Sequence, residues 1–166
     1  MKNILITGCA GFIGFSTSKI FLDNKTYKVY GIDSLNKYYS LKLKKKRLKI
    51  LKKYKNFNFK KIDIFNNKKL FLFLKNKKID MVFHFAAQAG VRYTISHPRK
   101  FLESNIVGFY NLLECLKFNN ISKFFYASSS SVYGDAKKFP LKESSKLNPR
   151  NIYGLSKTLN EEIVNI

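Results

Sequence analysis

Short apolar runs alternate with stretches of helical periodicity along the whole chain. The runs typical of strands occupy residues 4–6, 28–33, 58–64, 81–85 and 123–127. Between them, apolar residues recur every three or four positions, as they do on one face of a helix. The expected helices begin after Gly14, cover 39–54, 66–75 and 98–119, and run from Tyr153 to the end. This alternation predicts an α/β fold, a doubly wound parallel sheet with strand order 3-2-1-4-5.

The same spacing predicts which side of two helices is buried. In the helix over 39–54 we expect leucines on the inner side and the lysines, Lys44 among them, largely elsewhere. In the helix over 98–119 the expected inward stripe consists of Phe101, Leu102, Asn105, Phe109, Leu112, Leu113 and Leu116. Asn105 is the polar member of that stripe, so it needs a partner, which a cofactor amide or a neighbouring loop can supply.

Residues 7–14 read Thr-Gly-Cys-Ala-Gly-Phe-Ile-Gly and lie between the first strand and the first helix. Three glycines spaced three apart, Gly8, Gly11 and Gly14, let the chain turn sharply and let the backbone approach a pyrophosphate. Free N–H groups at the start of the helix attract phosphates. The stretch also resembles a lipoprotein cleavage box, but its apolar region is shorter than the roughly 7–15 residues of a secretory signal. We therefore predict a dinucleotide-binding turn.

Carboxylates and small residues follow the next strands. Asp33 ends the second strand about 20 residues beyond the turn, where an acidic residue accepts hydrogen bonds from adenosine ribose and repels the extra phosphate of NADP. It favours NAD, although a plain turn carboxylate is the alternative. Asp63 and Ile64 end the third strand and can bracket an adenine ring. Small residues at 86–90 leave room for a flat cofactor, and we interpret His84 as a core or supporting histidine.

Tyr153 and Lys157 are four residues apart, which places both side chains on one face of a helix. A free tyrosine has a pKa near ~10 and is a poor base, but a nearby ammonium and a positive nicotinamide ring both favour the phenolate. Tyr153 can then remove a hydroxyl proton while hydride leaves the same carbon for NAD, and Ser129 can hold the substrate oxygen. Alone, the pair could be a surface contact and the serine run a flexible loop; together with the turn they indicate dehydrogenase chemistry.

The composition narrows the class of protein and the partners to expect. The chain has 166 residues, 45% of them hydrophobic, and lacks an apolar stretch long enough to span a bilayer, so we expect one soluble domain. Cys9 and Cys115 fit no metal or redox spacing, which favours a reducing cytoplasm and no metal. A net charge of +22 raises nucleic acid or an anionic membrane as partners. The lysines are spread over most of the chain, so we interpret them as solvated and expect neither partner.

These motifs resemble the extended short-chain dehydrogenases/reductases that act on nucleotide sugars. The resemblance rests on residues 7–14, Asp63-Ile64, His-Phe-Ala-Ala-Gln at 84–88, Ser-Ser-Val-Tyr-Gly at 130–134 and Tyr153-x-x-x-Lys157. It implies a Rossmann-type NAD site at Gly8, Gly11, Phe12, Ile13, Gly14, Asp33, Asn36, Asp63, Ile64, Phe85, Ala86, Ala87, Gln88, Asn105, Tyr153 and Lys157. It also implies a catalytic trio of Ser129, Tyr153 and Lys157, with substrate contacts from Arg92, Ser129, Ser130 and Tyr153.

Within that family, residues 86–93 and 127–134 look most like UDP-glucuronate 4-epimerases. The expected reaction is UDP-glucuronate to UDP-galacturonate through a 4-keto sugar, in polysaccharide biosynthesis. Related 4,6-dehydratases carry an Asp-Glu pair where this chain has Ser130 and Ser131. The alternatives are a UDP-glucose/galactose or UDP-N-acetylhexosamine 4-epimerase, an inactive NAD-binding fragment, and a charge-driven nucleic-acid or membrane binder.

Members of the family continue for roughly another 150 residues, the size of a further domain. We therefore expect residues 1–166 to be an incomplete NAD-binding domain, cut before the C-terminal lobe that grips the nucleotide sugar. In the full-length form a homodimer is possible.

Overall fold

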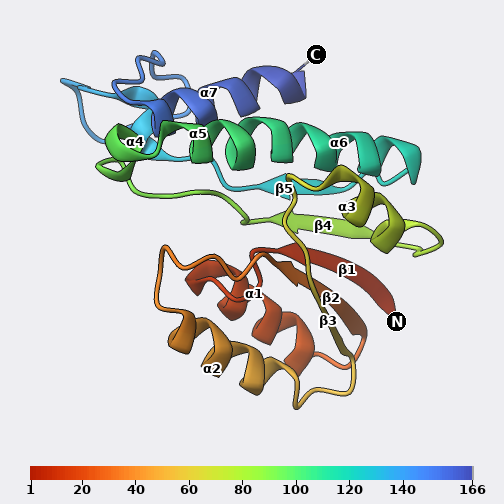
Figure 1. Ribbon diagram of the computed structural model, residues 1–166. Coiled ribbons are helices and arrows are strands. Elements are labelled where there is room, and N and C mark those ends of the chain that lie inside the picture. Colours follow the sequence, from red (N-terminus) through yellow and green to blue (C-terminus); the bar gives the residue numbers. More distant parts are fainter. Residues whose placement is uncertain (166) are drawn as a thin grey trace. The chain divides into compact units, whose positions relative to one another are not determined.

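A parallel five-stranded sheet organises the chain in the computed structural model, which describes residues 1–165 (Figure 1). The strand order is β3-β2-β1-β4-β5, and each neighbouring pair is parallel. The strands are β1 (Lys2–Thr7), β2 (Tyr27–Asp33), β3 (Phe57–Lys61), β4 (Met81–His84) and β5 (Phe124–Tyr126). The predicted fold class and strand order are confirmed.

Helices follow the strands as the periodicity predicted, with one difference. They are α1 (Phe12–Asp23), α2 (Leu41–Leu51), α3 (Asn67–Leu74), α4 (Tyr93–Ser96), α5 (Pro98–Phe101), α6 (Gly108–Phe118) and α7 (Ile152–Asn165). The expected single helix over 98–119 is interrupted by a π-helical segment, η1 (Leu102–Val107). A short 3-10 turn, η2 (Ser130–Tyr133), follows β5. Within residues 1–165, no helix is long and apolar enough to cross a membrane.

The chain divides into two compact units. The sheet unit comprises Met1–Ala86 and Asn111–Tyr126, and the helical unit comprises residues 87–110 and 127–165. In the helical unit, α7 packs against α5, η1 and η2. Each unit holds a different group of the predicted site residues.

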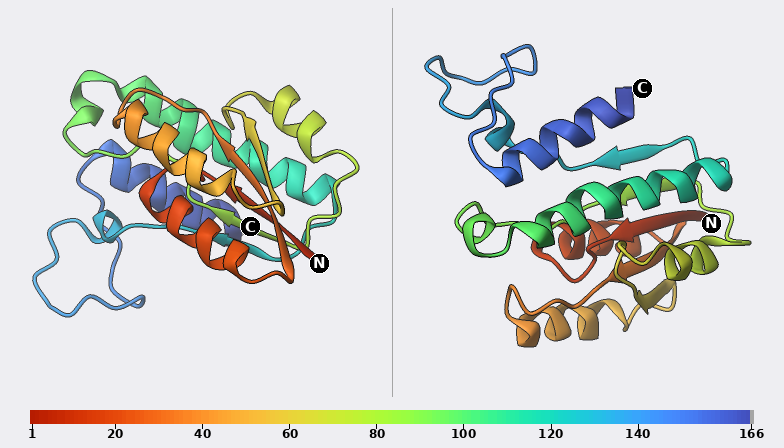
Figure 2. Two further views of the ribbon diagram at one scale, coloured as in Figure 1. Left: turned by 90° about the horizontal axis from the view of Figure 1, so that it is seen from below. Right: turned by 45° about the horizontal axis from the view of Figure 1, so that its top comes forward.

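The sheet unit has a core on each face of its strands, because successive strand side chains point to opposite faces. Ile4, Ile6 and Val29 pack with Leu22 of α1 and Leu48 of α2 on one face. The other core contains residues of the strands, of α3 and of the second half of α6, namely Leu5, Ile32, Val82, Leu70, Leu74, Leu112 and Leu116. Helices α1 and α2 lie side by side (Figure 2). Both cores together fix the carboxyl ends of the strands.

Two side chains lie on the opposite side of their helix from the one predicted. Lys44 was expected on the solvated side of α2, but it is only 7% exposed, because it shares the inward face with Leu48 and Leu51. Leu102 was expected inside, but it is 49% exposed. The π segment begins at Leu102 and changes the helical register there, so regular α-helical spacing misplaces this residue.

Candidate active site

The glycine turn has the geometry of an anion cradle. Gly8 has a φ of +69°, in the left-handed region that favours glycine. A Cβ on Gly14 would lie 2.2 Å from the Gly8 carbonyl oxygen, so only glycine lets α1 approach the turn this closely. Gly11 caps α1 without a side-chain hydrogen bond, which leaves N–H groups of the first helical turn for a ligand. The side chains of Phe12 and Ile13 are exposed, so their backbone N–H groups are the parts suited to a pyrophosphate.

Asp33 joins the end of β2 to this turn. Its Oδ2 accepts a hydrogen bond from the Ala10 N–H at 3.1 Å, and its Oδ1 accepts one from the Leu35 N–H at 2.7 Å. The carboxylate is only 7% exposed, and each oxygen has a further lone pair that a ribose hydroxyl can use. Burial, followed by the charge of Asp33, raises the pKa of the neighbouring Cys9 thiol well above its ordinary value. Cys9 is therefore a neutral packing residue.

Two basic side chains of α2 support the predicted cofactor site, Lys44 at the loop after β2 and Arg47 at the glycine turn, and the sequence interpretation missed both. Lys44 Nζ donates to Asn36 Oδ1 at 2.8 Å and to the Asn36 carbonyl oxygen at 3.1 Å. Arg47 Nη1 donates to the Ala10 carbonyl oxygen at 3.3 Å, and its guanidinium lies 5.8 Å from the centre of the Phe12 ring. The sequence did contain a signal for the burial of Lys44, because Lys44, Leu48 and Leu51 follow one another at helical spacing of three or four residues.

The predicted adenine contacts follow β3, which ends at Lys61, three residues earlier than expected. Asp63 Oδ1 accepts from the Phe65 N–H at 3.0 Å, and Ile64 is buried. Asn111 on α6 donates to the carbonyl oxygens of Ile64 and Phe65 at 3.1 and 3.0 Å. Asn111 therefore fixes this loop, a role that its position in the sequence does not indicate.

His84 belongs to the structural support of β4, as predicted. Its Nδ1 lies 2.7 Å from Thr7 Oγ1, and the same hydroxyl oxygen accepts from the Ala86 N–H at 3.1 Å. These bonds join the ends of β1 and β4, and they fix the backbone at Phe85 and Ala86 beside Gly8. A Cβ on Gly8 would lie 2.8 Å from the Ala86 nitrogen. The turn and the end of β4 are thus packed backbone to backbone.

In the helical unit, Asn105 finds its partner in a neighbouring loop. It is 1% exposed within η1; its Oδ1 accepts from the Gln88 N–H at 2.7 Å, and its Nδ2 donates to the Gln88 carbonyl oxygen at 3.0 Å. Nδ2 also donates to Ser156 Oγ at 3.1 Å. Both amide hydrogens are therefore in use, and a cofactor contact of Asn105, like those of Ala87 and Gln88, stays a prediction.

Two residues of the predicted catalytic trio, Tyr153 and Lys157, lie on α7, and the third, Ser129, precedes η2. Lys157 is 3% exposed, and its Nζ donates to the Ala127 carbonyl oxygen at 2.8 Å, two residues before Ser129. Burial lowers the pKa of Lys157 to about 8. Tyr153, one helical turn earlier, is half-buried and meets the Phe101 ring edge to face at 6.4 Å between centroids. Ser129 Oγ accepts from the Ser131 N–H at 3.2 Å and begins η2.

The predicted substrate residues are accessible. Arg92 is exposed at the start of α4, and Ser130 is exposed at the start of η2, while Ser129 and Tyr153 are half-buried. Their contacts with a sugar stay predictions. Ser156, which no motif singled out, donates its hydroxyl to the Tyr153 carbonyl oxygen at 2.7 Å and so links the Asn105 network to the catalytic helix.

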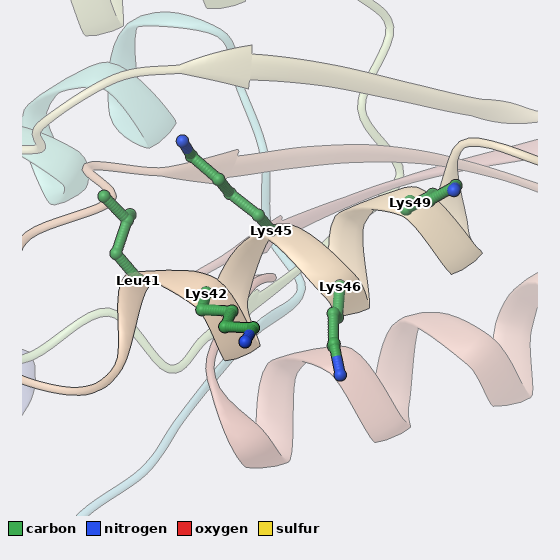
Figure 3. A pocket seen from close by; sticks show the side chains of 5 residues that line it. All are labelled: Leu41, Lys42, Lys45, Lys46 and Lys49. Carbon is green, nitrogen blue, oxygen red and sulfur yellow. The ribbon is translucent and has the colours of Figure 1, made fainter.

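A group of lysines on α2 has no such organisation. Leu41 and the lysines 42, 45, 46 and 49 line a shallow hollow, and their side chains spread away from one another (Figure 3). Separated lysine side chains suit solvation. The absence of a nucleic-acid or membrane partner stays a prediction.

Comparison with known proteins identifies the family. A family model described as GDP-mannose 4,6 dehydratase matches residues 5–166. The chain belongs to this family. It is one of the extended short-chain dehydrogenases/reductases that act on nucleotide sugars, as the motifs predicted. Protein CapI of Staphylococcus aureus is 45% identical over 95% of this chain and 47% of its own length. A UDP-glucuronate 4-epimerase of Thermodesulfobacterium geofontis is 42% identical over 90% of this chain and 47% of its own length.

Solved structures agree with this assignment. UDP-glucuronic acid 4-epimerase from Bacillus cereus, in complex with UDP-glucuronic acid and NAD, matches with a TM-score of 0.90 and 34% identity over 98% of this chain and 51% of that one. The UDP-Glc/GlcNAc 4-epimerase of Campylobacter jejuni matches with a TM-score of 0.90 and 30% identity, over 99% of this chain and 48% of that one. The chain spans about half the length of the curated relatives it matches. Three of the four proteins compared here are named as 4-epimerases, although the family model is described as a dehydratase.

Proposed function

We propose that the chain is the NAD-binding part of a nucleotide-sugar 4-epimerase that converts UDP-glucuronate to UDP-galacturonate. The observation that carries the proposal is Lys157, a buried lysine one helical turn from Tyr153 and bound to the backbone beside Ser129. A buried ammonium without a carboxylate partner costs free energy, and such groups concentrate at functional sites. We further propose that residues 1–166 form the NAD-binding domain and that a second domain holds the sugar.

The sheet unit fits a dinucleotide. Gly8 and Gly14 allow a close backbone packing of the turn that a Cβ would block, the N-terminus of α1 offers N–H groups to the pyrophosphate, and Asp33 offers acceptors to ribose hydroxyls. We expect Asp63 and Ile64 to contact the adenine ring and Asn36 to complete the ribose site. NAD, when bound, supplies reversible hydride acceptance at C4 of the sugar.

The helical unit supplies the proton chemistry. Tyr153 accepts the proton of the C4 hydroxyl group as the 4-keto sugar forms, and it returns the proton when hydride comes back to the other face. Lys157 places a buried ammonium one helical turn from Tyr153 on the same helix. Ser129 holds the C4 oxygen by a hydrogen bond. Ser130 and Ser131 stand where a dehydratase needs an acid and a base, so elimination of water is not expected.

The relatives support UDP-glucuronate as the first substrate to test. Two of the proteins compared above are UDP-glucuronate 4-epimerases, and one is a UDP-Glc/GlcNAc 4-epimerase. The second candidate is therefore a 4-epimerase of UDP-glucose or UDP-N-acetylglucosamine. The candidate of another class is an NAD-binding module without catalysis.

The test uses the full-length protein that contains residues 1–166. It is incubated with NAD and one UDP-sugar at a time, and interconversion is followed by anion-exchange chromatography. We expect UDP-glucuronate and UDP-galacturonate to interconvert. We also expect Tyr153→Phe to lower kcat at least about a thousandfold, since the proton acceptor is lost, while Tyr110→Phe, an exposed control, keeps full activity. Turnover of another UDP-sugar alone would refute the substrate assignment, and NAD binding without any turnover would favour the non-catalytic module.

A further inference from the structure

Two contacts tie the segment before η2 to the catalytic helix, and the mechanism uses only one of them. Lys157 Nζ donates to the Ala127 carbonyl oxygen at 2.8 Å. One residue further, the Ser128 hydroxyl donates to Glu161 Oε1. Lys157 and Glu161 are four residues apart on α7, one above the other on the same face. The segment is thus held at two points about one helical turn apart.

The second contact determines where Ser129 points. Ser129 is extended, with φ −158° and ψ 145°, and neighbouring side chains of an extended chain point to opposite sides. A single contact at Ala127 would leave the segment free to pivot about that bond. A second contact through the Ser128 side chain removes this freedom and so fixes the side on which Ser129 presents its hydroxyl.

The conformation of Ser129 also determines how η2 begins. Ser129 Oγ accepts from the Ser131 N–H at 3.2 Å, and the Ser129 carbonyl oxygen accepts from the Val132 N–H at 3.1 Å. Both bonds require Ser129 to keep its present conformation. The acceptor on α7 is a carboxylate, and hydrogen bonds to charged acceptors are roughly twice as strong as neutral ones. The Ser128–Glu161 contact is therefore a charge-assisted hydrogen bond, as is that of Lys157 with Ala127.

We propose that Ser128 and Glu161 are a positioning pair. They hold the Ser129 hydroxyl in the orientation that proton transfer with Tyr153 and Lys157 requires. This role rests on the proposed epimerase function. Neither residue touches the reacting atoms. Their contribution is the precise placement of the substrate oxygen, and a displacement of about 1 Å in such a site can cost on the order of a hundredfold in rate.

The first arm of the test is kinetic, with UDP-glucuronate and NAD. We expect Ser128→Ala and Glu161→Ala each to lower kcat at least about tenfold with KM changed less than about threefold, because substrate binding is retained while orientation is lost. The double variant should be no slower than the slower single variant, since both changes remove one interaction. Glu161→Gln, which keeps an acceptor oxygen, should recover much of kcat, and Glu162→Ala, the exposed neighbour on α7, should leave it unchanged.

The second arm measures amide hydrogen exchange of Ser131 and Val132 by nuclear magnetic resonance, which needs no turnover. Both amides should exchange at least about tenfold faster in Ser128→Ala and Glu161→Ala, and at the wild-type rate in Glu162→Ala. Unchanged exchange in the first two variants would overturn the proposal, as would unchanged kcat in an active protein. If the wild-type protein shows no turnover, the epimerase proposal fails on its own assay, and the exchange rates alone decide the positioning pair.

Discussion

Replacing Lys157 by methionine tests how burial controls the charge of this lysine. The ammonium group is 3% exposed and has a neutral partner, the Ala127 carbonyl oxygen, at 2.8 Å. Burial lowers its pKa from the ordinary value of 10.5 to about 8. Methionine has a similar length and no charge, so Lys157→Met removes the cost of burying the ammonium and keeps most of the packing.

The magnitude follows from the two pKa values. A pKa lowered from 10.5 to about 8 corresponds to about 3 kcal/mol, because one unit is about 1.4 kcal/mol. Between these pH values the unfolded chain holds a proton that the folded chain has released, so the stability of the wild-type protein rises with pH in this window. The full cost is present below pH 8 and disappears above pH 10.5. Any pH dependence of the hydrogen bond to Ala127 is already contained in the pKa of the folded state, so the difference between the two pH values depends on the two pKa values alone.

The assay is urea unfolding followed by circular dichroism at pH 7 and pH 11. We expect the free energy of unfolding of Lys157→Met, relative to wild type, to be about 3 kcal/mol more favourable at pH 7 than at pH 11. Lys146→Met, which removes an exposed lysine of the same unit, controls for the loss of one charge. A relative stability that is the same at both pH values would refute the inference that burial depresses the pKa of Lys157.

Three further changes test the cofactor site and its support. Gly14→Ala should weaken NAD binding at least about tenfold by calorimetry, because the new Cβ would lie 2.2 Å from the Gly8 carbonyl oxygen, and Gly11→Ala, at 3.1 Å from that oxygen, should be milder. Asp33→Ala should also raise the Kd for NAD at least about tenfold, since a charged acceptor is worth about 1.5–3 kcal/mol; an unchanged Kd would contradict the ribose assignment. Asn105→Leu should lower the free energy of unfolding by at least about 2 kcal/mol in urea, because two buried backbone groups lose their partner; equal midpoints would contradict this.

Local sequence patterns were sufficient to predict the strands, the glycine turn and the places of Asp33, Tyr153 and Lys157 in the fold. Hydrophobic periodicity reports which residues share a face, and glycine spacing reports where the backbone must turn, so both can be read along the chain. The strand order followed from the alternation of strands and helices, which restricts the connections in a parallel sheet. The burial of His84 was predicted for the same reason, as it lies inside an apolar strand.

Contacts between distant residues were decided by the tertiary structure. Lys44 is buried because a loop oxygen of Asn36 receives its ammonium, and Leu102 is exposed because a π segment changes the helical register. The contact of Ser128 with Glu161 joins residues 33 positions apart. Periodicity contains no information about such pairs, because they depend on how separate elements pack and not on the spacing within one element. The sequence alone therefore determined which chemical groups the site contains, and the tertiary structure decided which neighbours hold them in place.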